Sequence, residues 1–463
     1  MKRTVLLVSA AASFLVPFMS AALNVALPAM SRDFAVSATL LNWSVTAYIL
    51  ATAAFILPAG RLGDLWGRKK VFLTGLTLFT FFTLLCPLAS SFQLLVVLRA
   101  MQGAGGALIF ATSVAMLSSA CPPAERGRAL GLNTAAVYLG ISLGPPLGGI
   151  LTQALGWGSI FTLTAAVAFF LLVLTAWALR GLDWRGLQGR FDGVGALLYA
   201  GSVSLLIYGL SQAGESLTNL YLALGGVATL FLFVLWESRR PDPLLPMRLF
   251  VGNRPFAFSN LAALVNYTAT FGHAVIISFY LQTVKGLSPQ LAGLLMLVQA
   301  LVQAIFSPLA GRAADRVEPR LLASLGMALS TISLALFIFL EAGTPLFWVI
   351  ANTALMGLGF ALFSSPNTYA VMNAVHAKEY GVASSTLGAM RVVGQSVAMA
   401  LLSLLFALWL GTAEISPAVV EPFLGAARTS YGIAAALSFA AIFASLARGR
   451  SRPEVARPVG ACP

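Results

Sequence analysis

Charged residues are scarce in this sequence. Only 9% of its 463 residues are Asp, Glu, Lys or Arg, and 59% are hydrophobic. A soluble protein carries about 25% charged residues, so this composition excludes an ordinary soluble protein. Apolar segments long enough to cross a hydrocarbon core about 30 Å thick recur through the chain. A membrane protein is therefore expected.

Cysteine and histidine are also rare. The three cysteines, Cys86, Cys121 and Cys462, have neither disulfide nor metal-ligand spacing, and the chain holds only two histidines. The sequence contains no nucleotide-binding loop and no pattern typical of a catalytic nucleophile. We therefore expect no enzyme activity, no cofactor and no metal site.

Hydropathy predicts an all-α membrane protein with fourteen transmembrane helices, whose backbone hydrogen bonds close within each segment as lipid requires. The basic start and the apolar run after it resemble a signal peptide, but the run reaches about residue 30 and is too long for one, so we expect a retained first span. The predicted spans lie near residues 5–30, 41–60, 71–89, 93–118, 128–152, 157–179, 193–213, 219–236, 256–282, 290–310, 321–340, 346–372, 383–410 and 427–446.

The formal net charge of +13 is an orientation signal rather than a nucleic-acid-binding surface. With the N-terminus inside, almost all lysines and arginines fall in loops on one side. Only Arg32, Lys285 and Arg428 fall on the other side, while Arg99 and Arg391 lie within spans. The positive-inside rule then places both termini in the cytoplasm.

Two short loops are alike and indicate two related halves. "GRLGDLWGRKK" begins at Gly60 and "GRAADRVEPR" at Gly311. Their separation exceeds the roughly 190 residues that six spans with short loops need, so two further helices are inserted between the halves. We expect a six-helix bundle over 1–180, two inserted helices with linkers over 181–254, a second six-helix bundle over 255–448 and a cytoplasmic tail over 449–463.

The loop from Gly60 to Lys70 resembles the signature loop of the major facilitator superfamily. Asp64, at a helix end, is suited to pair with an arginine from a neighbouring helix and to release it when the conformation changes. Arg68 of the same loop is a further candidate gating residue. Asp315 takes the same place in the second loop. A plain basic loop that sets topology is the alternative.

The fifth predicted span contains a glycine-rich stretch, residues 140–149. It is similar at every fixed position to the antiporter motif of the superfamily's drug exporters. The resemblance implies a bent, smooth helix that lies against a helix of the other half and controls rocking, while a plain packing interface is the alternative. The motif residues are Gly140, Gly144, Pro145, Gly148 and Gly149.

The stretch "LRAMQGAGGALI", residues 98–109, matches the fourth-helix motif of the drug:proton antiporters, in which the arginine, here Arg99, is implicated in proton transfer. Residues 43–64 and 381–398 resemble the second and penultimate helices of the fourteen-span branch. The resemblance covers essentially the whole chain and implies the major facilitator fold. It also implies a monomeric, proton-coupled exporter of small amphipathic compounds in the lipid bilayer of a bacterial inner membrane, working by alternating access.

One position departs from that branch. Met19 stands where the family commonly has an aspartate, five residues before the Asn24 position. No predicted span carries a carboxylate near its middle, so Arg99 needs other partners, for which Asn24 and Gln102 are candidates. Arg99 is then either a structural clamp between the first and fourth helices or a proton gate.

Several polar residues are candidates for the transport pathway. His273 is the only histidine within a predicted span, and its unperturbed pKa lies near neutral, so it is a candidate proton-coupling group or an ordinary hydrogen-bonded histidine. A cavity with arginine and histidine but no acid favours neutral or anionic substrates. The candidate cavity residues are Ser20, Asn24, Tyr48, Tyr138, Asn266, Thr270, Gln299, Gln303, Asn352, Asn367, Arg391 and Gln395.

Two other functions fit the same pattern. A facilitator or an exporter of one metabolite, lipid or amino acid would need the same fold and gates. A membrane sensor that does not transport is a more distant alternative, because no segment resembles a signalling domain.

Overall fold

The computed structural model describes residues 2–36, 38–181, 186–211, 217–410 and 420–449. Fourteen helices within this part of the chain are long and apolar enough to span a membrane, which confirms the predicted number. The predicted tail over 449–463 falls, apart from its first residue, outside the described residues.

The N-terminal half consists of six long helices. They are α1 (Lys2–Phe34), α2 (Ala38–Trp66), α3 (Arg68–Leu85), α4 (Phe92–Ala120), α5 (Pro123–Leu155) and α6 (Gly158–Ala178). Short connections end these helices at residues that favour a turn. Gly67 and Gly156 take positive φ angles of 99° and 81°, and the Ser91 side chain caps the start of α4 by accepting from the Leu94 amide.

The C-terminal half also supplies six spans. Its ninth span is built from three pieces, α10 (Arg254–Thr270), α11 (Gly272–Phe279) and a short π-helix (Tyr280–Val284). The other five are α12 (Pro289–Ala314), α13 (Pro319–Phe337), α14 (Leu346–Asn373), α15 (Tyr380–Leu410) and α16 (Val420–Ala447).

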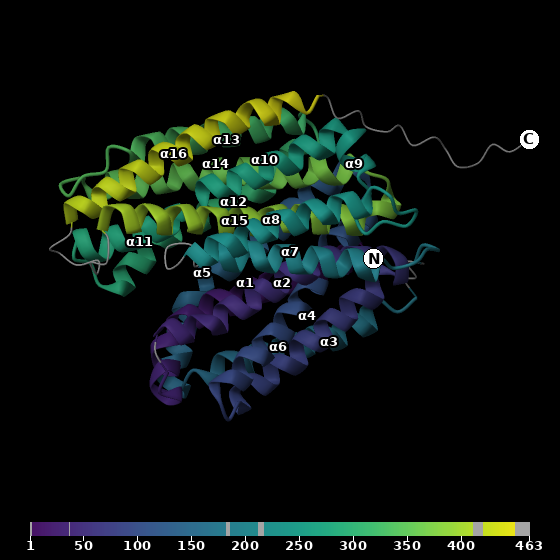
Figure 1. The fold of residues 1–463 in the computed structure, drawn as a ribbon, viewed down its shortest axis with the longest axis horizontal. Coiled ribbons are helices and arrows are strands. Elements are labelled where there is room, and N and C mark those ends of the chain that lie inside the picture. Colours follow the sequence, from purple (N-terminus) through teal and green to yellow (C-terminus); the bar gives the residue numbers. More distant parts are fainter. Residues whose placement is uncertain (1, 37, 182–185, 212–216, 411–419, 450–463) are drawn as a thin grey trace, which may run out of the picture.

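The inserted hairpin of α7 (Gly193–Ser211) and α8 (Leu217–Glu237) packs against α2 and α15, one helix from each half (Figure 1). The short helix α9 (Arg248–Val251) then leads into the C-terminal half. The halves themselves meet where α5 packs on α12 and where α2 and α4 pack on α15.

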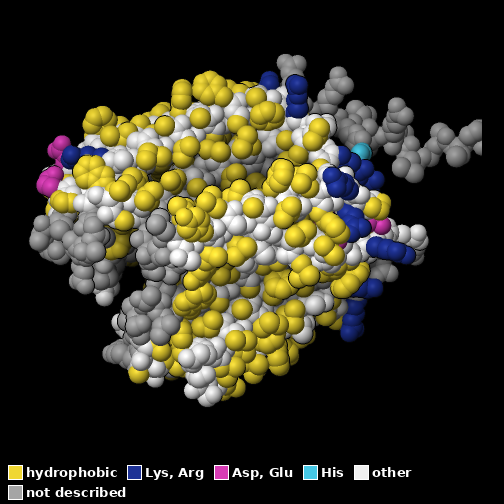
Figure 2. All heavy atoms as spheres, in the orientation of Figure 1, with side chains coloured by type: hydrophobic (Ala, Val, Ile, Leu, Met, Phe, Trp, Pro, Cys, Tyr) yellow, Lys and Arg dark blue, Asp and Glu magenta, His cyan; other side chains and the backbone are white. Residues whose placement is uncertain are grey.

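Lysine and arginine side chains gather at one end of the bundle, called here the basic end (Figure 2). It comprises the first turns of α1, α3, α5 and α15 and the last turns of α2, α4, α12 and α14. In Figure 1 the ribbons of the two halves lie together at this end and diverge towards the opposite end. Contacts between the two halves at the basic end therefore keep this end of the bundle closed.

Candidate functional site

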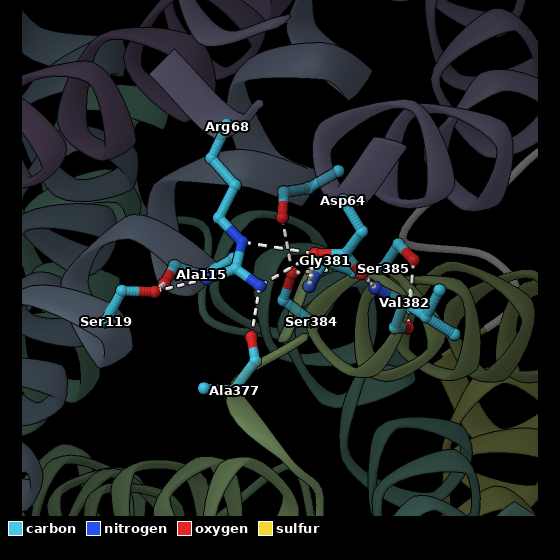
Figure 3. A network of polar contacts seen from close by, with 10 residues as sticks. Asp64, Arg68, Ala115, Ser119, Ala377, Gly381, Val382, Ser384 and Ser385 are labelled. Carbon is cyan, nitrogen blue, oxygen red and sulfur yellow. Dashed lines mark hydrogen bonds and ion pairs between the residues drawn. The ribbon is translucent and has the colours of Figure 1, made fainter. Parts of the chain in front are cut away.

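The Asp64 carboxylate joins the two halves at the basic end (Figure 3). Asp64 lies at the end of α2, and its two oxygens accept hydrogen bonds from the backbone amides of Gly381 and Val382, at 2.9 and 3.0 Å, in the first turn of α15. An anion at a helix N-terminus is stabilised by the free N–H groups and the helix dipole. Asp64 is 4% exposed, so water screens this contact little.

Arg68 completes this contact from the first turn of α3. Its guanidinium donates to the Asp64 carboxylate at 2.8 Å, and it also donates to the Ser119 hydroxyl of α4 and to the main-chain oxygen of Ala377, just before α15 (Figure 3). The predicted pairing of Asp64 with an arginine is therefore present. Arg68 extends the pair to a second point on the C-terminal half.

A second carboxylate makes the same contact with the halves exchanged. Asp315 follows α12 of the C-terminal half, and its oxygens accept from the backbone amides of Gly127 and Arg128 in the first turn of α5, at 2.7 and 3.0 Å. Burial raises the pKa of this carboxyl, although the two backbone donors oppose the rise. The repeated loops predicted from sequence thus form two equivalent inter-half contacts.

Glycines allow the helices to approach at both contacts. A Cβ on Gly60 would collide with the carbonyl oxygen of Gly381, and a Cβ on Gly127 would collide with that of Gly311. Each contact therefore depends on a pair of facing glycines, one from each half. We call Asp64, Asp315, their amide donors and these glycine pairs the basic-end gate.

Tyr380 adds an aromatic contact to the gate. The guanidinium carbons of Arg68 and Arg126 lie 5.3 and 5.2 Å from the centre of its ring, within the range of cation–π attraction. Arg126 also donates to the Asn373 side chain at the end of α14. Two cations of the N-terminal half therefore hold one aromatic ring of the C-terminal half.

Farther from the basic end, four aromatic residues and one arginine from both halves form the interface cluster. Tyr138 of α5 packs edge-on against Phe360 of α14 at 5.7 Å between ring centres, and Tyr267 of α10 packs on the same ring at 5.4 Å. The guanidinium of Arg391 lies 4.9 Å from the ring centre of Phe110 in α4 and acts electrostatically on Tyr138.

Arg391 is half-buried and forms no ion pair with any carboxylate that the structure describes. The described carboxylates that are buried, Asp64, Glu237 and Glu379, lie on other helices or near the basic end. The interface cluster therefore presents apolar rings, tyrosine hydroxyls and one positive charge. Such a surface is suited to a planar apolar compound with an acidic or carbonyl group.

His273 lies inside the C-terminal half rather than between the halves. Its Nδ1 atom is 3.1 Å from the Tyr431 hydroxyl of α16, and its ring packs on Phe337 at 4.8 Å. A cavity of about 40 Å³ beside it is lined by α10, α11, α15 and α16 and has room for water. His273 is 2% exposed, and its ring forms part of the wall of this cavity.

Arg99 contacts other helices of its own half, but not the first helix as expected. Its guanidinium donates to the Ser44 main-chain oxygen of α2 at 3.0 Å and to Gln102, which in turn donates to Thr83 of α3. The predicted partner Asn24 is exposed and is not involved. Arg99 therefore ties α4 to α2 and α3.

The surroundings of Arg99 are mostly apolar. Its charge lies 4.4 Å from the ring centre of Tyr48 and 6.0 Å from that of Phe161, and the side chain is fully buried. Met19, at the position where the family commonly has an acid, is itself fully buried in the apolar core. Tyr48 was expected to line the cavity, but the structure places it in this cluster, 5% exposed.

The antiporter-motif glycines face α1 of their own half, which corrects the expectation that they face the other half. A Cβ on Gly140 would collide with the main chain of Phe14, and one on Gly144 or Gly148 with Ala21 or Ala22. Gly149 has only an ordinary contact, at 3.6 Å, with Val25. The smooth face of α5, with Pro145 inside the helix, allows α1 and α5 to pack closely.

Two predicted cavity residues instead join helices within the C-terminal half. Asn352 donates to the Ser333 main-chain oxygen at 3.1 Å, linking α14 to α13. Asn367 donates to the Ser259 main-chain oxygen of α10 and accepts from Arg448. In this structure both amides hold neighbouring helices together, and their role in a substrate cavity stays a prediction.

The remaining candidates differ in burial. Ser20, Gln299 and Gln395 are half-buried, whereas Gln303 is buried. Thr270 donates to the Asn266 main-chain oxygen of its own helix. Both side-chain polar atoms of Asn266 are buried and have no hydrogen-bond partner among the described residues. These positions stay predictions for the transport pathway.

Sequence reasoning missed several residues that the structure brings together. Phe110, Tyr267 and Phe360 gave no signal, because single aromatic residues are common in apolar helices. Arg448 was placed in a loop, yet it is fully buried and donates to Ser259, Asn367 and Ser445. Burial lowers its pKa to about 10, so it stays charged at neutral pH.

A family model described as Major Facilitator Superfamily matches residues 9–185 and 260–462. The unmatched segment between them contains the inserted hairpin. Among curated proteins, the chain is 34% identical over 410 residues to Multidrug resistance protein Stp of Mycobacterium tuberculosis, covering 87% of this chain and 74% of Stp. It is 30% identical to Riboflavin transporter RibZ of Clostridioides difficile, covering 90% of this chain and 91% of RibZ.

Solved structures share the fold at low sequence identity. The human organic anion transporter MFSD10 superposes with a TM-score of 0.72 at 15% identity, over 96% of this chain and 99% of MFSD10. The proton:xylose symporter XylE superposes with a TM-score of 0.65, also at 15% identity, over 96% of this chain and 94% of XylE.

Proposed function

Because this chain belongs to the major facilitator superfamily of membrane transporters and is of its drug-efflux type, we propose that it is a proton-coupled exporter of small amphipathic compounds. It works by alternating access, with residues 1–180 and 255–448 as the two rocking bodies. The basic end faces the cytoplasm by the positive-inside rule, in the inner membrane of a bacterium.

The basic-end gate is the observation that carries this proposal. Asp64 and Asp315 each bind two backbone amides of the opposite half, so the closed gate rests on four hydrogen bonds to charged acceptors. With the cytoplasmic end closed, the protein is in its outward-facing state. When both carboxylates release the backbone amides that they bind in the opposite half, the cytoplasmic end opens.

The interface cluster supports a neutral or anionic substrate that carries an aromatic or planar apolar group. Arg391 supplies a positive charge for a carboxylate or carbonyl oxygen, and Tyr138, Tyr267 and Phe360 supply ring faces and hydroxyls. The names of the two relatives, which cover multidrug resistance and riboflavin transport, support a small organic substrate.

His273 is our candidate for the group that exchanges the coupling proton. Its imidazole is the one side chain in a described span with an ordinary pKa near neutral, and a water-sized cavity adjoins it. Rocking of the C-terminal half would expose this cavity to one side and then to the other. Tyr431, hydrogen-bonded to the imidazole, orients the ring.

Transport into proteoliposomes under an imposed pH gradient tests the proposal. A panel of cationic, neutral and acidic amphiphiles is expected to show gradient-driven movement of neutral and acidic members. His273→Gln should abolish the gradient dependence while counterflow without a gradient continues, and His376→Gln at the basic end is the matched control. Transport that ignores the gradient would refute proton coupling.

A transporter dedicated to one metabolite is the second candidate function, favoured by the likeness to a riboflavin transporter over 90% of the chain. The same panel separates the two candidates. Movement of a single compound class, with no competition by unrelated amphiphiles, would support the dedicated transporter.

A further inference from the structure

The linkers of the inserted hairpin bind the N-terminal side of the basic-end gate. The Leu187 amide donates to the main-chain oxygen of Asp64 itself at 2.8 Å. Gly186 lies so close to the Leu65 carbonyl that a Cβ there would collide with it. After α8, the Asp242 carboxylate lies 3.9 Å from the Arg61 guanidinium in the signature loop. Both linkers therefore hold the loop that positions Asp64.

The same linkers reach the C-terminal side. Arg248 of α9 donates to Glu379 at 2.8 Å, directly before the first turn of α15. Asn253 donates to the main-chain oxygen of Ala374, just after α14. The two segments 186–192 and 238–253, which we call the strap, thus connect the two halves across the closed gate.

Glu237 lies where the hairpin meets the strap. It ends α8, is 2% exposed, and one oxygen, Oε2, accepts from the Leu245 amide at 2.9 Å. The other oxygen, Oε1, is buried and has no hydrogen-bond partner among the described residues. A buried carboxylate oxygen without a donor is costly if it is charged.

A second carboxylate adjoins this oxygen. A Cβ added to Gly195 would collide with Glu237 Oε1 and would lie 3.0 Å from Asp192 Oδ2, so the two acids lie against the same point of α7. Asp192 is already fixed, because it accepts from the Gly195 amide at 2.9 Å and from the Trp236 indole at 2.8 Å. It therefore faces Glu237 as a like charge and as an acceptor.

Few cations offset these acids. The charged groups that act on Glu237 are Asp192 before α7 and Arg61 of α2. Arg240 and Asp242, after α8, lie beside Asp192 and Arg61 respectively. Arg240 is 3.9 Å from Asp192 with its side chain 42% exposed, and Arg61 is 3.9 Å from Asp242, so neither is a tight partner of Glu237. A proton on Oε1 would give that oxygen a donor and remove the like-charge contact.

We propose that Glu237 is a proton-binding site that makes closure of the basic-end gate depend on cytoplasmic pH. With the proton bound, the Glu237 side chain carries no charge, and the strap packs on the loop that contains Asp64. Loss of the proton leaves a buried charge beside Asp192, which loosens the strap and favours opening of the gate to the cytoplasm. This proton stays at the basic end and is distinct from the one exchanged for substrate.

Distance measurement across the gate tests this proposal. Spin labels are placed at the exposed positions Lys70 and Arg316 in the full-length protein in lipid nanodiscs, after replacement of its three cysteines. Between about pH 5.5 and about pH 8.5, the closed population should fall as pH rises, by up to about tenfold per pH unit for a single proton.

Variants of the two acids identify the site. Glu237→Gln, which mimics the protonated acid, should keep the gate closed across the range. Asp192→Asn, which removes the adjacent negative charge, should move the transition to lower pH. Glu421→Gln, an exposed acid at the opposite end of the bundle, is the control and should behave as the parent. A transition unchanged by both Glu237→Gln and Asp192→Asn would overturn the proposal.

The inference rests on the proposed alternating access, but its failure is separable from failure of the exporter function. A protein that transports the panel under a pH gradient, yet shows a gate insensitive to Glu237→Gln, refutes the proton site alone. A protein whose label distances shift with pH and with Glu237→Gln, yet moves no compound, refutes the exporter function and leaves the proton site supported.

Discussion

Asp64 and Asp315 occupy equivalent positions in the two halves, each accepting two backbone hydrogen bonds from the first turn of a helix in the opposite half. Their surroundings differ. Arg68 follows Asp64 by four residues and forms an ion pair with it, whereas Pro319 stands at the same offset after Asp315. The contact made by the N-terminal loop is therefore the stronger of the two.

This asymmetry predicts unequal effects of removing each charge. A hydrogen bond to a charged group contributes about 1.5–3 kcal/mol, so Asp64→Asn should shift the gate towards its open state by more than about tenfold. Asp315→Asn should have a smaller effect, because no arginine is left without its partner. Spin-label distances between Lys70 and Arg316 measure both, and equal shifts would contradict the asymmetry.

Adding one methyl group at a gate glycine should prevent closure. Gly127→Ala brings a Cβ against the Gly311 carbonyl and the Asp315 carboxylate, so α5 and α12 must separate and the closed state loses stability. Export should fall at least tenfold while the protein still folds. Gly149→Ala is the control, because its Cβ finds only an ordinary contact at 3.6 Å. Full export by Gly127→Ala would show that the gate does not close this tightly during transport.

Arg391 should discriminate between substrates by charge. Arg391→Gln removes the one cation of the interface cluster, so export of acidic amphiphiles should drop at least tenfold and that of neutral ones should change little. Arg391→Lys should restore part of the loss. Arg428→Gln, remote from the cluster, is the control, and competition assays in proteoliposomes measure all three. An equal loss for acidic and neutral compounds would assign Arg391 a structural role.

Arg99 should matter for stability more than for coupling. Its guanidinium holds Ser44 and Gln102, and the rings of Tyr48 and Phe161 surround its charge. Arg99→Ala therefore leaves a cavity and unpaired polar groups, at a cost of about 2–5 kcal/mol in unfolding free energy. Thermal unfolding in detergent measures this. The residual transport should still respond to a pH gradient. Selective loss of that response would instead support the alternative role of Arg99 as a proton gate.

Arg448 should stabilise the C-terminal half. It is fully buried and is held by Ser259, Asn367 and Ser445 rather than by a carboxylate. Arg448→Ala should lower the unfolding free energy by about 2–4 kcal/mol, because Asn367 and Ser259 lose a charged donor. Arg450, in the adjoining tail, supplies the control substitution Arg450→Ala. Melting curves that coincide with the parent would contradict this role.

The two carboxylates of the gate could be singled out from sequence because each lies in one of two short, similar loops. Gly60, Asp64 and Arg68 fall within nine residues, and the Gly311 loop repeats the pattern. The donors for Asp64, Gly381 and Val382, were not predictable, because more than 300 residues separate them from it. The interface cluster could not be predicted for the same reason, because its members come from five helices in both halves of the chain.

The sequence by itself determined the membrane environment, the fourteen spans, the side on which basic residues gather and the two repeated loops. These features depend on local hydropathy and on short motifs. The tertiary structure alone decided which polar side chains meet, because that depends on how each helix is rotated about its axis and on which neighbour it packs. This rotation placed Asn367 against α10 and Tyr48 beside Arg99, directed the antiporter glycines to α1, and buried Glu237 beside Asp192.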